Sequence, residues 1–272
     1  MPTSLRRIQI AFCCLAMVFL IGPTFAIIPI SFSSANFLSY PLPGFSLQWY
    51  AKILQPQPWM SALMNSLIIG VGATIVATGL GTVAALGMSR GSLPARSAIL
   101  AVVISPMIVP VVISGVGMYF FFAKLGLVAS FLGLVLAHAV LAVPFVVITV
   151  TATLKNFDMN LVRAATSLGA SPLHAFRTVT LPLIAPGVIS GALFAFVFSF
   201  DEVVVALFIS GPGQRTLPRQ MFDGLRDNID PSILAMSTLL VIISIILMGG
   251  GALAQKRAAA NRTAERQGAE AI

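Results

Sequence analysis

Six stretches of apolar residues, each long enough to cross a lipid bilayer, dominate this chain of 272 residues. The hydrocarbon core of a bilayer is about 30 Å thick, and a helix needs roughly 20 apolar residues to cross it. Charged residues make up only 9% of the sequence, whereas about a quarter is usual in soluble globular proteins. The nearly uniform hydrophobicity favours helices over alternating strands. We therefore expect an all-α polytopic membrane protein with about six transmembrane helices, at residues 8–32, 61–87, 97–121, 127–151, 183–209 and 232–254.

The basic residues indicate how these helices are oriented. If both termini are cytoplasmic, eleven of the sixteen Lys and Arg residues fall on the inner side. Cytoplasmic loops carry such an excess, so we expect a multi-pass protein of the bacterial inner membrane with both termini inside and a cytoplasmic tail at residues 255–272. This topology accounts for the net charge of +8, and no basic cluster is interleaved with aromatic residues, so nucleic acid is not an expected partner.

A polar segment at residues 154–182 separates two of the apolar stretches. Asn156 or Asp158 can cap a helix, and Gly169 can end it in the left-handed conformation. Ser171 can cap a second short helix, from Pro172 to Thr178, because proline at the first helical position loses no hydrogen bond. The spacing therefore predicts a helix–turn–helix with one apolar face on its first helix: Leu161, Ala164, Ala165 and Leu168. The alternative is an amphipathic loop that packs on its own bundle.

The same segment resembles the cytoplasmic docking loop of ATP-binding-cassette (ABC) importer permeases. The resemblance rests on Ala164–Ala165, Gly169–Ala170, Phe176 and Leu181–Pro182, which keep the order and spacing of that loop. The sequence departs from the family at Arg163, where the family usually has Glu. The resemblance implies one type I permease domain over residues 1–272 and a set of ATPase-docking residues: Arg163, Ala164, Ala165, Gly169, Ala170, Ser171, Pro172, Leu173, His174, Phe176, Leu181 and Pro182.

The chain has no phosphate-binding loop of its own. Such a loop needs Gly followed by Lys and then Ser or Thr, and none of the four lysines follows a glycine. We therefore expect no enzymatic activity and no cofactor in this chain, with ATP and Mg²⁺ bound by a separate ATPase. The resemblance implies an ATPase dimer, a second permease subunit and a periplasmic solute-binding protein as partners, besides the lipid bilayer.

Asp201 and Glu202 are the candidates for a substrate path. Two adjacent carboxylates inside the fifth apolar stretch are costly in a membrane, so they are expected to face a cavity or a partner. Residues 198–218 resemble the matching segment of spermidine/putrescine permeases, as do Ala137–His138–Ala139 and Pro144–Phe145 in the fourth stretch. The resemblance implies a polyamine substrate. The pair could instead have a structural role, and the solute could be another, such as iron(III).

Two further patterns predict how the helices pack. Small residues recur every fourth position at Ala73, Ala77, Gly81 and Ala85, which lets a second helix approach closely. Prolines at positions 106, 110 and 144 predict kinks near a pathway. For His138 we expect a bond to a neighbouring helix rather than a metal, because no second His or Cys lies at ligand spacing. An ion-coupled secondary transporter is the alternative class, and it would favour paired interrupted helices and a charge relay.

Overall fold

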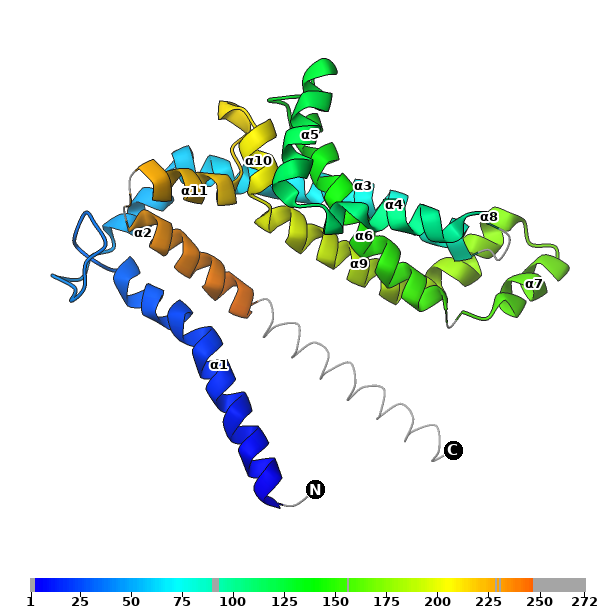
Figure 1. Ribbon diagram of the computed structural model, residues 1–272, viewed down its shortest axis with the longest axis horizontal. Helices are drawn as coiled ribbons and strands as arrows, with labels where there is room; N and C mark the ends of the chain where they lie inside the picture. The colour runs from blue at the N-terminus through cyan, green and yellow to red at the C-terminus, as the bar shows by residue number, and fades with distance from the viewer. Residues whose placement is uncertain (1–2, 90–92, 156, 228, 230, 247–272) are drawn as a thin grey trace, which may run out of the picture. The chain divides into compact units, whose positions relative to one another are not determined.

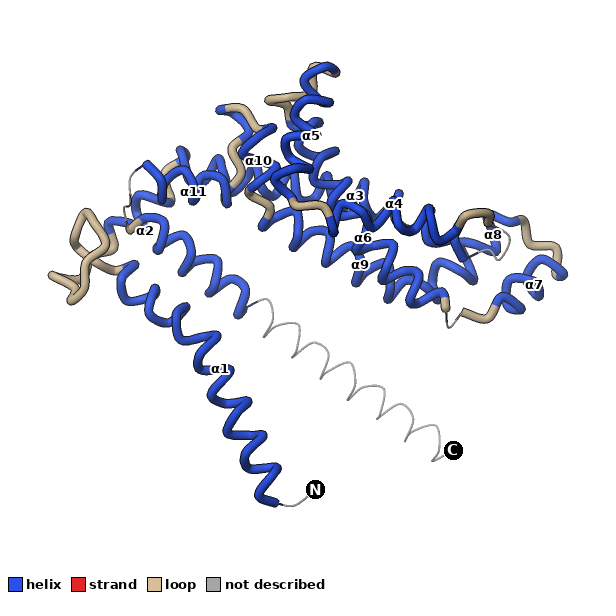
Figure 2. The backbone as a smooth tube through the Cα atoms, viewed as in Figure 1, coloured by secondary structure: helices blue, strands red, loops and turns tan. Residues whose placement is uncertain are grey.

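The computed structural model describes all residues except 1–2, 90–92, 156, 228, 230 and 247–272. Within the described residues the chain is helical, with no strand beyond one isolated bridge between Ser33 and Phe45 (Figure 2). Two compact units are present. Residues 57–222 form one, and the described residues of 1–56 and 223–246 belong to the other. The prediction of a single domain over residues 1–272 stays a prediction, and the predicted tail lies outside the described residues.

Among the described residues, three helices lie wholly within the smaller unit. Helix α1 (Thr3–Ser31) is followed by an irregular loop and the short helix α2 (Gln48–Ile53). An apolar helix, Ser232–Ile246, follows α11 (Leu217–Asp227) and covers the described part of the sixth apolar stretch. Within α1, the stretch Leu5–Ser31 is long and apolar enough to span a membrane, as the sequence predicts for the first apolar stretch.

The larger unit is built around three helices that lie side by side: α3 (Ser61–Ser89), α6 (Phe131–Leu154) and α9 (Leu181–Asp201) (Figure 1). Their shared core consists mostly of small and β-branched side chains: Ala73, Ala77, Ala85, Ala139, Ala142, Val146, Val150, Ile184 and Ala195. The predicted small-residue pattern is confirmed, because all four of its members are buried on α3. Close approach is also visible at Gly191, where an added Cβ would lie 2.6 Å from Thr149 Oγ1 and 3.0 Å from Val146 Cα.

The third apolar stretch is not one continuous helix. Helix α4 (Arg96–Ile108) ends at Val109, α5 (Val111–Lys124) begins after Pro110, and the two helices are bent by 103°. Pro110 offers no N–H to continue the helix, and it restricts Val109 to an extended conformation, with φ −69° and ψ 133°. The kink predicted at Pro110 is thus confirmed as a full break, whereas Pro106 and Pro144 lie inside the helices α4 and α6, which continue through them. The described residues therefore hold four helices fit to span a membrane, or five if the bent pair counts as one.

The fifth apolar stretch is broken as well, which corrects the predicted helix over 183–209. Helix α9 ends at Asp201, Glu202 is extended with φ −70° and ψ 114°, and α10 (Val204–Ile209) follows. No proline stands at this break. The side chain of Glu202 explains it, because its Oε1 accepts a hydrogen bond from Val205 N at 3.0 Å and so satisfies the start of α10.

Candidate functional site

The polar segment forms the predicted helix–turn–helix, beginning with α7 (Met159–Ser167). Asp158 caps this helix, and its Oδ1 accepts a hydrogen bond from Asn160 N at 2.9 Å. The second candidate cap, Asn156, lies outside the described residues. An aspartate at this position satisfies an otherwise unpaired backbone donor and places negative charge at the positive end of the helix. The local sequence signal therefore fixes where α7 begins.

Gly169 ends α7 as predicted, with φ +88°. Ala170 N donates to Ala165 O at 3.1 Å, and Gly169 N donates to Thr166 O at 3.0 Å. This pair of bonds is the Schellman arrangement, which needs a residue in the left-handed region and therefore favours glycine. The turn sets the angle between the two helices of the segment.

The second helix, α8 (Pro172–Ala175), begins as predicted but does not end as a separate short helix. Ser171 Oγ accepts a hydrogen bond from His174 N at 3.3 Å, and Pro172 occupies the first turn. A π-helical turn, η2 (Phe176–Thr180), then leads directly into α9. Leu181 and Pro182 consequently lie in the first turn of the membrane helix, and any movement of α8 is passed to α9 through a continuous helical backbone.

The predicted apolar face of α7 is largely exposed. Leu161 and Ala164 are exposed, and Leu168 is 90% exposed at the tip of the segment. An open groove of about 620 Å³ runs between α7 and α8, lined by Ala165, Leu168, Gly169, Ala170, Ser171, His174 and Thr178. The structure therefore presents an exposed apolar edge and a groove on a segment that projects from the bundle (Figure 1).

Arg163 stands on α7 at the position where the sequence departs from the family pattern. Its side chain is exposed, and Nη1 lies 3.4 Å from Asn160 Oδ1, a long and weak hydrogen bond. Within the described residues no carboxylate forms an ion pair with it. The guanidinium is therefore available to an approaching protein.

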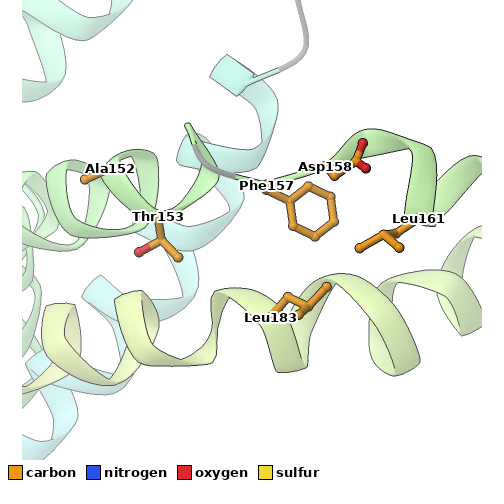
Figure 3. Close-up of a pocket in the computed structure, with 6 residues that line it drawn as sticks. All are labelled: Ala152, Thr153, Phe157, Asp158, Leu161 and Leu183. Atoms are coloured by element: carbon orange, nitrogen blue, oxygen red, sulfur yellow. The ribbon is translucent and has the colours of Figure 1, made fainter.

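A pocket of about 540 Å³ joins the root of α7 to the membrane helices (Figure 3). Phe157 and Leu161 point across it toward Leu183 of α9, while Thr153 comes from the end of α6. Asp158 lines the same pocket and also caps α7. Because the walls come from three helices, a shift of α7 changes the contact of both α6 and α9.

Asp201 and Glu202 do not lie well inside a helix, and their predicted position on one continuous helix is wrong. Gly70 of α3 faces Phe196 of α9, because an added Cβ on Gly70 would lie 3.2 Å from Phe196 Cε2. Asp201 is five residues further on, or about 7.5 Å at 1.5 Å per residue, toward the end where α3 begins. The acidic pair therefore lies near one end of the core, about 30 Å along α9 from Leu181 at the polar segment.

The two carboxylates have different surroundings. Glu202 is partly buried and accepts the hydrogen bond that caps α10, so its side chain has a structural role. Asp201 is exposed, and in the described part of the chain it has no hydrogen bond or ion pair. It lies four residues after Val197, on a face of α9 that is otherwise apolar and exposed. Of the two carboxylates, Asp201 is therefore the one that is exposed and has no partner among the described residues.

His138 is fully buried between α6 and α9. Its Nδ1 lies 2.9 Å from Ser199 Oγ and 3.1 Å from Ser199 O, which confirms the expected bond to a neighbouring helix. Within the described residues no group of three potential ligands could hold a metal ion. The sequence reasoning did not find Ser199 as the partner, because 61 positions separate the two residues.

A loop after α10 is tied back to α3 near the acidic pair. Asn65 Nδ2 donates to Gly213 O at 3.1 Å and to Arg215 O at 3.0 Å, and Leu217 N donates to Ser66 Oγ at 2.8 Å. Arg219 Nη1 donates to Ala206 O at 3.1 Å and also bonds both oxygens of Ser210. These bonds hold the loop against the first turns of α3 and hold α10 against Arg219. No short-range sequence pattern indicates them.

Comparison with known proteins places the chain among transport permeases. A profile described as binding-protein-dependent transport system inner membrane component matches residues 77–259. The putrescine transport system permease protein PotI of Escherichia coli K12 is 34% identical over 234 residues, covering 84% of this chain and 83% of PotI. The spermidine/putrescine transport system permease protein PotC of the same strain is 29% identical over 226 residues, covering 83% and 85%.

The fold is also shared with a solved transporter. The crystal structure of a bacterial ABC transporter involved in the import of the acidic polysaccharide alginate matches with a TM-score of 0.69 at 16% identity. The match covers 94% of this chain and 98% of the other. At this level of identity the similarity concerns the fold.

Proposed function

The chain belongs to the family of binding-protein-dependent transport system inner membrane components, as a permease subunit of an ABC importer, and from this we propose that its solute is a polyamine of the putrescine and spermidine class. The proposal rests on the similarity to PotI and PotC over more than four-fifths of the chain. A polyamine is a flexible chain with two or more positive charges. An exposed carboxylate at the end of an apolar path attracts such a solute.

Asp201 is the residue we assign to the solute. It is the exposed member of the acidic pair, whereas Glu202 is engaged in capping α10. Asp201 lies near the end of the helical core that is remote from the polar segment. It therefore meets the solute at the entrance of the translocation path. An attraction at the mouth raises the rate of capture and is weakened by salt.

The polar segment supplies the contact with a separate ATPase. Its apolar edge at Leu161, Ala164 and Leu168 is unburied, and the groove between α7 and α8 offers room for side chains of a partner. Exposed apolar surface of this kind on a projecting segment marks a protein contact. Closure of an ATPase dimer on ATP would move α7 and α8, and the helical backbone through η2 would pass that movement to α9.

The proposed topology places the polar segment and both termini in the cytoplasm. It follows from the eleven Lys and Arg residues on that side against five on the other. Asp201 then faces the periplasm, where a solute-binding protein releases its ligand. A second permease subunit completes the path, since one chain alone leaves the face of α9 around Leu193, Val197 and Asp201 uncovered.

ATP hydrolysis by the reconstituted complex tests the solute class. The permease, its partner subunits and the solute-binding protein are assembled in vesicles, and hydrolysis is measured with putrescine, spermidine or iron(III) as the added solute. We expect the two polyamines to stimulate hydrolysis and iron(III) to leave it at the basal rate. Stimulation by iron(III) alone would assign the complex to another solute.

A further inference from the structure

The loop between α1 and α2 exposes aromatic side chains and carries no charge. We call residues 32–47 the aromatic loop. Phe37, Tyr40 and Phe45 are exposed by 66%, 83% and 81%, and Leu47 is exposed as well. No Asp, Glu, Lys or Arg occurs between residues 32 and 51. An uncharged loop with several exposed aromatic rings is a poor match for water.

Hydrogen bonds fold the aromatic loop back onto the end of α1. Ser34 N donates to Gly44 O at 3.0 Å, and Ser46 N donates to Phe32 O at 2.7 Å. These bonds pair Phe45 with Ser33, two residues after the last residue of α1. Phe45 is therefore held at the level where a membrane-spanning helix ends.

Helix α2 is fixed to the same level. Trp49 Nε1 donates to Ser33 O at 2.8 Å, and Tyr50 OH lies 2.8 Å from Ser31 Oγ. Lys52 Nζ stands 5.2 Å from the centre of the Trp49 ring. Trp49 is buried, at 7% exposure, so these contacts hold α2 against the end of α1. Tyr40 of the aromatic loop is the exposed ring with a polar end, and such side chains collect where the hydrocarbon core meets the headgroups.

We infer that residues 32–53 form an interfacial lipid anchor, with Phe37, Tyr40 and Phe45 inserted among the headgroups around the end of α1. The depth is set by the bonds to Ser31 and Ser33, and α1 itself exposes apolar side chains along its length, among them Phe19 and Phe25. The attachment of the loop to the end of a helix long and apolar enough to span a membrane favours a lipid surface over a soluble protein. This anchor lies before the residues matched by the family profile, 77–259.

Spin labels at the exposed rings test the anchor directly. Cys13 and Cys14 are replaced by alanine, and single cysteines are introduced as Phe45→Cys or Tyr40→Cys in the full chain. The partner subunits are freed of cysteine and assembled with it in vesicles of equal parts phosphatidylethanolamine and phosphatidylglycerol. Collision of the label with oxygen, which partitions into lipid, is compared with collision with a nickel chelate, which stays in water.

Two further positions calibrate the measurement. Phe19→Cys on the exposed face of α1 reports the hydrocarbon core, and Arg215→Cys reports water. We expect oxygen-to-nickel ratios at positions 40 and 45 to exceed that at position 215 severalfold, and to fall below that at position 19. A ratio equal to that at position 215 would overturn the anchor. Loss of nickel collisions only after the solute-binding protein is added would instead make the loop a protein contact and refute a lipid role.

Discussion

Replacing Gly169 by valine tests how the polar segment works. The glycine has φ +88°, and an added Cβ would meet no atom within 4 Å, so the substitution strains the backbone without a collision. A side chain in the left-handed conformation costs about 1–2 kcal/mol. This cost lowers the ratio of native to non-native turn by a factor of about 5–30. The two bonds from Ala170 N and Gly169 N, which set the angle between α7 and α8, are weakened by the same free energy.

The expected result is a complex in which ATP hydrolysis no longer responds to the loaded solute-binding protein. We would measure how much ATPase copurifies with the Gly169→Val permease and the stimulated hydrolysis rate in vesicles. Gly169→Asn should lie between the native chain and the valine variant, because asparagine tolerates this conformation better.

Gly126 provides a matched control. It follows α5 with φ +67°, also has no atom within 4 Å of an added Cβ, and belongs to the same kind of turn, with Leu127 N bonded to Phe122 O at 2.9 Å. Gly126→Val imposes the same backbone strain away from the polar segment. ATP hydrolysis by the Gly126→Val complex should still respond to the loaded solute-binding protein. Normal coupling in Gly169→Val, or equal loss in both variants, would refute the docking account.

Three further predictions follow from the same geometry. Arg163→Glu should reduce the amount of ATPase that copurifies, since a carboxylate or neutral surface is expected opposite the guanidinium. An unchanged amount of copurified ATPase would mean that position 163 faces solvent. Asp201→Asn should slow polyamine uptake at low solute concentration and low salt while the complex stays assembled, whereas Glu202→Gln should chiefly lower thermal stability, because it weakens the cap of α10. Equal uptake by Asp201→Asn and the native chain at low salt would contradict an electrostatic role for Asp201. Gly191→Ala should destabilise the core by about 1–3 kcal/mol through overpacking, while Gly79→Ala should not, because an added Cβ there meets no atom within 4 Å. Thermal unfolding in detergent compares the two variants, and equal melting temperatures would contradict the close packing of α6 and α9.

Local signals in the sequence predict the polar segment well. Asp158, Gly169 and Ser171 act through hydrogen bonds within a few residues, so their effect on helix ends does not depend on the rest of the fold. The small-residue pattern on α3 was equally readable, because it repeats with the helical period. The break at Pro110 follows from the missing N–H, although the angle of 103° depends on packing.

The break after Asp201 could not be read from hydrophobicity. Apolar residues continue on both sides of it, and the helical pattern carries on through Val204 and Ile209. The signal is the side chain of Glu202, which can cap a new helix, but an isolated acid in an apolar stretch equally suggests a buried functional group. The bonds of Asn65 to the loop after α10 join positions about 150 residues apart and depend on the complete fold.

ATP-dependent uptake of labelled putrescine and spermidine tests the central claim most directly. The complete importer is reconstituted in vesicles with the solute-binding protein on the side opposite the polar segment. Uptake should require ATP on the side of the polar segment, stop with Gly169→Val, and continue when ion gradients are collapsed. Uptake that follows an ion gradient without ATP, or transport of iron(III) with no transport of either polyamine, would contradict the account.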